Sequence, residues 1–183
     1  PRPAPRGRPR AASPVARGAG KQWPGWWLQM QHFAEDGAPA AAGKVLGVYR
    51  EALEEMPRQA KAKAYGIVLE SFADAGDVQG AADWHAQLRE ARVHPRAEVY
   101  GKLARSAVAA EDADAAAGWL ELQRRRTHDS DDGSVARCNG ELNACARAGD
   151  RARAEAWLGA MRQAALEPNA VSYTALVAAC ARG

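Results

Sequence analysis

Cysteine and histidine are the residues of this 183-residue chain that could bind a metal or act on a substrate. Cys138 and Cys145 lie on one face of a predicted helix, and Cys180 follows Cys145 by 35 residues. No HExxH, GxSxG, Walker or CxxC pattern occurs, and the histidines are scattered: His32, His85, His94 and His128. We therefore predict that the cysteines are small core residues, that the chain holds no metal or other cofactor, and that it is not an enzyme.

Basic residues are the second group that could do chemistry, by contacting phosphate or carboxylate groups. Residues 1–22 hold six basic residues and no acidic one, which leaves 19 basic and 22 acidic residues in the rest of the chain. Five prolines among the first 14 residues exclude a helix there. We predict an extended arm whose basic side chains, together with the adjacent Trp23, contact a partner or phosphate: Arg2, Arg6, Arg8, Arg10, Arg17 and Lys21.

An arginine-rich N-terminus without acidic residues is also typical of an organellar transit region. We therefore expect a nuclear-encoded protein of a plastid or mitochondrion whose transit region is cleaved. The cluster that follows, Trp23-Pro24-Gly25-Trp26-Trp27, has two interpretations: a staple onto the first helix or an anchor to a partner. We expect Trp26 and Trp27 to pack at the start of that helix.

The composition favours helices as the elements that position these side chains. Alanine, the best helix former, contributes 44 residues, whereas isoleucine occurs once, at Ile67. Few β-branched residues remain for strands, so a β-sandwich and a parallel α/β sheet are excluded. No apolar run approaches the roughly 18 residues of a transmembrane helix. The predicted fold class is all-α.

Aromatic and turn residues repeat at a spacing of about 35. Trp84 and Trp119 are 35 apart, Trp157 follows 38 later, and Tyr65 and Tyr100 are again 35 apart. Each unit is predicted to be a helix, a tight turn and a second helix; in the third, Asn139–Ala148 and Arg151–Ala164 flank a turn capped by Gly149 and Asp150. The three extra residues are assigned to the polar loop 127–133. Such hairpins must stack to bury their apolar faces.

The predicted organisation is a basic Pro/Arg-rich arm at 1–22, a Trp-rich segment with a degenerate hairpin at 23–61, repeat 1 at 62–96, repeat 2 with a loop insertion at 97–134, repeat 3 at 135–169, and the first helix of a truncated repeat 4 at 170–183. The degenerate hairpin is expected at 26–34 and 44–56, with Tyr49 at the tryptophan position. Because Gly183 falls before the turn of a fourth unit, we expect the natural protein to continue.

The stretches 139–150 and 171–183 resemble the first helix of the pentatricopeptide repeat family. The tetratricopeptide repeat, with 34 residues, fits the spacing less well. The resemblance covers about residues 62–183 and implies a right-handed α-solenoid of helix-turn-helix repeats of about 35 residues.

In the resembled family, one unit contacts one base of single-stranded RNA. The resemblance implies that Asn139 and Asn169 face the edge of a pyrimidine, usually cytosine, while Ala136 packs against the base. Val171 and Thr174 take the corresponding places in the fourth unit. At the same positions, the other two units have residues that are less suited to contact a base. The first unit has Gly66 and Arg96 with Lys63, and the second has Gly101 with Glu98 and either Asp131 or Gly133. One complete unit of three is therefore equipped to read a base.

Two functions remain open from the sequence. The first is a non-catalytic scaffold or adaptor docked on protein subunits of a large organellar assembly, either a photosynthetic or respiratory complex or a ribosome. The second is an organellar protein that binds single-stranded RNA and acts in transcript processing or translation. A ribosome-associated protein would satisfy both, with the arm placed on ribosomal RNA.

Overall fold

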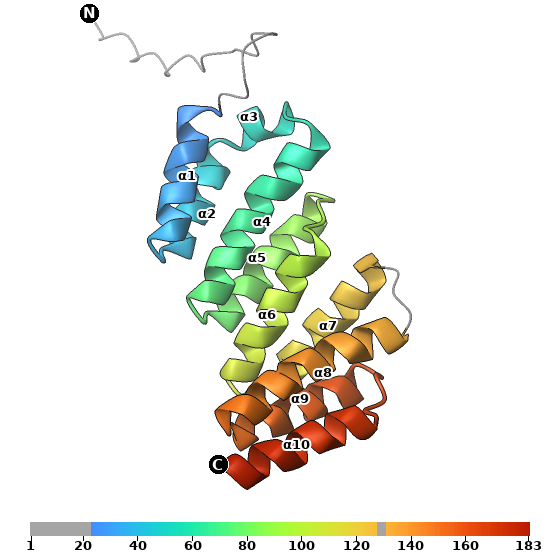
Figure 1. The fold of residues 1–183 in the computed structure, drawn as a ribbon. Helices are drawn as coiled ribbons and strands as arrows, with labels where there is room; N and C mark the ends of the chain where they lie inside the picture. Colours follow the sequence, from blue (N-terminus) through green and yellow to red (C-terminus); the bar gives the residue numbers. More distant parts are fainter. Residues whose placement is uncertain (1–22, 128–130) are drawn as a thin grey trace, which may run out of the picture.

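A computed structural model describes residues 23–127 and 131–183, and every regular element in these ranges is a helix (Figure 1). The predicted arm at 1–22, with its six basic contact residues, lies outside the described residues. The helices are α1 (Gly25–Glu35), α2 (Pro39–Val48), α3 (Arg50–Glu54), α4 (Arg58–Asp74), α5 (Val78–Glu90), α6 (Ala97–Ala109), α7 (Ala113–Thr127), α8 (Asp131–Ala148), α9 (Arg151–Gln163) and α10 (Ala170–Arg182).

Consecutive helices form the repeated hairpins. The pairs α4/α5, α6/α7 and α8/α9 correspond to the three predicted units, but α4 and α8 begin before the predicted starts of their units at residues 62 and 135; α10 begins the fourth. Figure 1 shows the first helices, α4, α6, α8 and α10, along one side of the stack, with the second helices behind them. The predicted all-α solenoid is therefore confirmed.

The turn inside each hairpin is built the same way three times. Gly76, Glu111 and Gly149 adopt positive φ angles of 72°, 60° and 69°, which end the first helix in the left-handed region. The aspartate that follows each of them accepts a hydrogen bond from the backbone N–H three residues later, at 2.8, 2.9 and 3.0 Å. This bond caps the second helix, as expected for the third unit.

The repeated residues meet inside the stack. The tryptophans at the 35-residue spacing are buried, as are the alanines three residues before them: Ala81 with Trp84, Ala116 with Trp119, and Ala154 with Trp157. Alanine at these positions brings neighbouring helices close enough for the large indole rings to fill the space between hairpins. The residues that recur every 35 positions are therefore packing residues, and they set the spacing between the first helices of successive units.

The N-terminal hairpin differs from the prediction. Its second helix begins at Pro39, which suits the first helical position, rather than at residue 44. It also breaks at Tyr49, which separates α2 from α3. Tyr49 is exposed and stacks on Trp26 with ring centroids 5.6 Å apart, so its assignment to the buried tryptophan position was wrong.

Trp23 is part of the packing at this end of the stack. Its ring lies on that of the fully buried Trp27, with centroids 4.1 Å apart. The Lys63 ammonium lies 5.3 Å from the Trp23 ring centroid. Trp26 and Trp27 pack at the start of α1 as expected, whereas Trp23, predicted as a partner contact, is partly buried within the chain.

Helix α8 begins at Asp131, eight residues before its predicted start at Asn139. The apolar stripe explains the extension, because Val135, Cys138 and Leu142 are all buried and follow the helical spacing. Much of the predicted loop at 127–133 is therefore helical. α8 has 18 residues, compared with 17 in α4 and 13 in α6, and Asp131 and Gly133 belong to α8 rather than to the end of the preceding unit.

Candidate functional site

The two asparagines predicted to read a base lie together where α8 meets the start of α10. The Asn139 side chain projects from α8, and its Nδ2 donates a hydrogen bond to Asn169 Oδ1 at 3.2 Å. Asn169 is the N-cap of α10, because its Oδ1 accepts from the backbone N–H groups of Val171, at 3.0 Å, and Ser172, at 3.3 Å. Both carbonyl oxygens of the predicted pair are thus directed into the chain.

Ser172 completes this network, and the sequence analysis did not identify it. Its Oγ donates to Asn139 Oδ1 at 2.5 Å and accepts from the Asn169 backbone N–H at 3.1 Å. Ser172 is fully buried and Asn139 is only 7% exposed, whereas Asn169 is exposed. The spacing of an N-cap residue and a polar residue three positions later, Asn169 and Ser172, is the signal that could have revealed it. We call Asn139, Asn169 and Ser172 the amide junction.

The remaining base-contact residues lie outside this network. Ala136 and Val171 are exposed, as a residue that packs against a base requires. Thr174 is also exposed, but its Oγ1 donates to the carbonyl oxygen of Ala170 at 2.7 Å within α10. The structure therefore brings Asn139 and Asn169 together and leaves the other three predicted contacts at separate surface positions.

The first two units contain no comparable pair. Gly66 and Gly101, the positions equivalent to Asn139, are buried against the side chains of Val99 and Gln123. Their lack of a side chain serves the close approach of neighbouring elements. Glu98 is exposed on α6 and carries a negative charge toward the region where a phosphate would lie.

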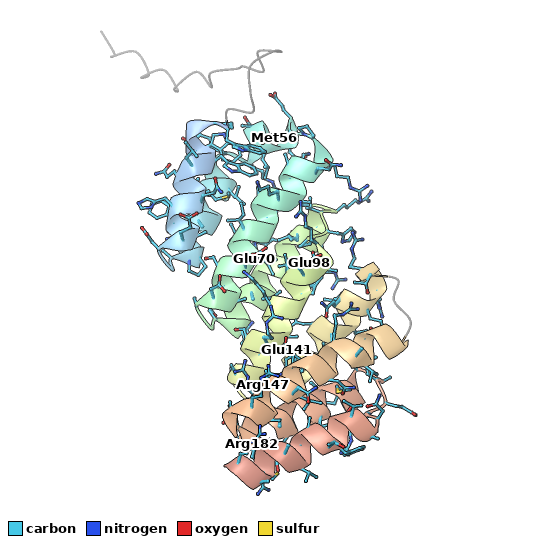
Figure 2. The ribbon with its side chains drawn as sticks, viewed as in Figure 1. Met56, Glu70, Glu98, Glu141, Arg147 and Arg182 are labelled. Atoms are coloured by element: carbon cyan, nitrogen blue, oxygen red, sulfur yellow. The ribbon has the colours of Figure 1, made fainter. Side chains whose placement is uncertain are left out.

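Ion pairs link the first helices to one another. Lys102 of α6 contacts Glu70 at 2.9 Å and Asp74 at 3.8 Å on α4, and the hydrogen bond that Lys102 donates to Glu70 raises the pKa of Lys102. Arg105 of α6 contacts Glu141 of α8 at 3.2 Å. Figure 2 shows Glu70 on α4 and Glu141 on α8 along the same side of the stack. Lys102 and Arg105, which could contact phosphates, are thus already paired.

Large apolar side chains are exposed at the two ends of the described stack. Leu28, Val48 and Tyr49 lie in the N-terminal hairpin region, where Tyr49 stacks on Trp26. At the other end, α10 exposes a second apolar set: Val171, Tyr173 and Val177. We call the first set the N-terminal apolar patch.

The cysteines and histidines form no metal site in the described ranges, where no group of three or more metal-ligating side chains occurs. Cys138 and Cys145 are buried as predicted, and burial raises the pKa of the Cys138 thiol to about 11. Cys180 is exposed, so its assignment to the core was wrong; no described helix covers that face of α10. His85 packs edge to face against the rings of Tyr100 and Trp119, which stack on each other, and burial lowers the pKa of His85.

The family model of the pentatricopeptide repeat domain matches residues 133–182, which span most of α8, α9 and α10. This part of the chain is similar to the pentatricopeptide repeat domain, so the resemblance is confirmed there. Repeats of this family indicate a helical-repeat protein that binds RNA or acts as an adaptor, and its members are generally non-catalytic. No curated protein sequence matches the chain. Among the described residues, no helix has the length and apolar character needed to cross a membrane.

Proposed function

We propose that this chain, whose residues 133–182 are similar to the pentatricopeptide repeat domain, is a helical-repeat adaptor that binds protein subunits of a larger assembly and does not read RNA bases. The observation that carries this proposal is the amide junction. Asn139 is buried there, and its amide group is bonded to Asn169 and Ser172.

The energy of that junction argues against base reading. For its amide group to turn to a base edge, Asn139 must give up its bonds to Asn169 and Ser172, which leaves the buried Ser172 hydroxyl only the longer bond of 3.4 Å to Asn169 Oδ1. An unsatisfied buried polar group costs about 1–3 kcal/mol. A good two-bond contact to a base edge contributes about 1–3 kcal/mol of discrimination. Opening the junction therefore lowers the affinity for any base by about as much as one good base contact contributes.

The exposed apolar side chains support a protein partner. Interfaces use aromatic and large apolar anchors surrounded by polar residues. The N-terminal apolar patch supplies such anchors, since Leu28 and Val48 are 58% and 78% exposed in the same hairpin region as the stacked rings of Trp26 and Tyr49. The slight excess of acidic over basic residues in 23–183 further disfavours a phosphate backbone as the partner.

We place this adaptor in a plastid or mitochondrion, docked in a photosynthetic or respiratory complex or on a ribosome. Proteins of this repeat family are commonly organellar. The arginine-rich, acid-free composition of residues 1–22 supports the same location.

A second candidate function is single-stranded RNA binding in transcript processing or translation. One observation favours it: Asn139 and Asn169 lie within hydrogen-bond distance of each other, as a base-reading pair would, and Ala136 and Val171 are exposed. Binding of this kind requires the amide junction to open.

Capture of partners from organelles before and after RNase treatment separates the two functions. We expect the tagged full chain to retain its protein partners after RNase. The double variant Leu28→Glu with Val48→Glu should lose them, because it places charges in the N-terminal apolar patch. Gln29→Glu with Ala40→Glu adds the same two charges at exposed positions of the same helices and should retain them. Loss of all partners after RNase contradicts the adaptor function.

A further inference from the structure

A cavity of about 530 Å³ lies between α4, α6 and α9, at the junction of the second and third units. Its polar lining comes from three cations, one carboxylate and one hydroxyl: Lys102, Arg105, Arg153, Asp74 and Ser106. Its apolar lining consists of the small side chains of Ala73, Ala109 and Ala110. We call this site the α6–α9 cavity. It is distinct from the amide junction, which lies on the other side of α8.

Arg153 is unusual for its place in the repeat. It is the third residue of α9, and the corresponding residues of α5 and α7 are Gly80 and Ala115. In the first unit, a Cβ atom at Gly80 would lie 2.6 Å from the Phe72 ring, so there is no room for a side chain. The third unit instead places a guanidinium group at this position, where it lines the α6–α9 cavity and a smaller one of about 90 Å³ beside α8.

Two polar atoms at this cavity lack partners. Arg153 Nε and Ser106 Oγ are both buried, and neither has a hydrogen-bond partner within the part of the chain that the structure describes. Buried polar groups are normally satisfied, so an exception calls for an explanation, such as a group that binds there. Lys102 is paired with Glu70, and Arg105 with Glu141.

The charges around Arg153 indicate which chemical group would bind there. Arg153 has no carboxylate within 4 Å among residues 23–127 and 131–183, while the other two cations of the cavity are already paired. One unpaired guanidinium matches one negative charge, and its planar donors suit the two oxygens of a carboxylate. The Ser106 hydroxyl supplies a further donor, and the alanine methyl groups suit the methylene stem of a glutamate side chain.

We propose that the α6–α9 cavity, with Arg153 and Ser106 at its unsatisfied positions, binds an acidic side chain of a protein partner. This inference rests on the proposed adaptor function and names the chemistry of the partner segment. The carboxylate accepts hydrogen bonds from Arg153 and Ser106, and Lys102 and Arg105 add positive charge around it. Partner binding then joins the second and third units, because Ser106 lies on α6 and Arg153 on α9.

Arginine Nε–Hε resonances in NMR spectra of the full chain test the site directly. The probe is an acetylated and amidated pentapeptide with glutamate at the centre of four alanines, and the matched peptide carries glutamine instead. We expect the glutamate peptide to shift the Arg153 resonance saturably, and the glutamine peptide to leave it unchanged. Arg153→Ala and Ser106→Ala should each weaken binding at least about tenfold, which is roughly the loss of one charge-assisted hydrogen bond.

Arg151→Ala is the matched control, because Arg151 lies on the same turn of α9 but is exposed and paired with Glu155. It should bind the glutamate peptide as the unchanged chain does. Equal shifts with both peptides overturn the proposal. So does saturation by inorganic phosphate or oligouridylate at lower concentrations than by the glutamate peptide, because the site would then be a phosphate site.

The failure of this inference can be distinguished from the failure of the adaptor function. If partner capture survives RNase but Arg153→Ala captures the same partners at the same level, the adaptor function stands and the cavity is not its contact. If all partners are lost after RNase, the adaptor function itself fails, whatever the peptide titration shows.

Discussion

Helix α8 packs against α10 on one side and faces α6 on the other, and the two junctions are held by different interactions. Toward α10 lies the amide junction, in which Asn139 and Ser172 are buried and bonded to each other. Toward α6 lies the ion pair between Arg105 and Glu141, whose side chains are 43% and 31% exposed. Beside that pair lies the α6–α9 cavity, with Arg153 at its edge.

The difference shows where this stack is closed and where it can accept a partner. The side chains that the family resemblance assigns to RNA are used to join two units. The side chain that breaks the pattern of small residues, Arg153 in place of Gly80 and Ala115, leaves an unsatisfied cation at the other junction. A binding site is therefore better sought where a unit departs from the repeat, as at Arg153, than at the positions that recur in every unit.

The largest expected effect is at the amide junction. Asn139→Ala removes the hydrogen bonds to Asn169 and from Ser172, and leaves the buried Ser172 hydroxyl only the longer bond of 3.4 Å to Asn169 Oδ1. The free energy of unfolding should fall by about 2–3 kcal/mol, measured by urea denaturation. Asn143→Ala, at an exposed position of the same helix, should change it by less than about 0.5 kcal/mol. Equal effects of the two variants would show that the junction is not closed.

The next effect concerns alkaline pH and Cys138, which precedes Asn139 on α8. Because burial raises the pKa of the folded thiol from 9.0 to about 11, the unfolded chain loses this proton first as the pH rises. The stabilising contribution is fully present below pH 9 and is lost as the pH approaches 11, by about 2 kcal/mol. Urea denaturation across this range should show a shallower decline for Cys138→Ala than for the exposed-site control Cys180→Ala. Parallel declines would contradict the burial.

A smaller effect is expected at the junction with α6. Arg105→Gln or Glu141→Gln breaks an ion pair whose two side chains remain partly exposed, so water compensates much of the lost attraction. The free energy of unfolding should fall by less than about 1 kcal/mol, and high salt should reduce the difference further. A loss as large as that of Asn139→Ala would remove the contrast between the two junctions.

The smallest effect on stability is expected for Arg153→Ala. The substitution deletes a guanidinium whose buried Nε has no partner in the described part of the chain, and alanine already occupies the equivalent position in the second unit. The midpoint of thermal unfolding should stay the same or rise slightly. A fall equivalent to more than about 2 kcal/mol would mean that Arg153 is a structural residue, because breaking a buried polar network produces losses of that size.

The repeat positions were predictable because packing fixes them. The spacing of Trp84, Trp119 and Trp157 gave three correct hairpins, since a ring of that size has one place in each unit. Asn139 and Asn169 lie together in the structure, but how they are used was not predictable from the pair alone. The distinction depends on Ser172, which turns an exposed amide pair into a closed network.

Departures from the repeat were harder to predict. Tyr49 was assigned to a tryptophan position from its spacing, yet it lies at the break between α2 and α3, where no helix places it in the core. The start of α8 was predicted as a loop, because its polar residues obscured the helical spacing of the buried residues Val135, Cys138 and Leu142. The α6–α9 cavity depends on contacts between α4, α6 and α9, which no local pattern records.

The central claim is that the closed amide junction keeps this repeat from reading bases. Fluorescence anisotropy with the full chain, a pyrimidine 12-mer and a purine 12-mer of single-stranded RNA tests it directly. We predict equal affinities for the two strands, with the same dependence on salt, because any binding would come from basic groups that neutralise phosphates. A preference of about tenfold or more for the pyrimidine strand, abolished by Asn169→Asp, which keeps an N-cap acceptor but removes the amide nitrogen, would contradict the claim.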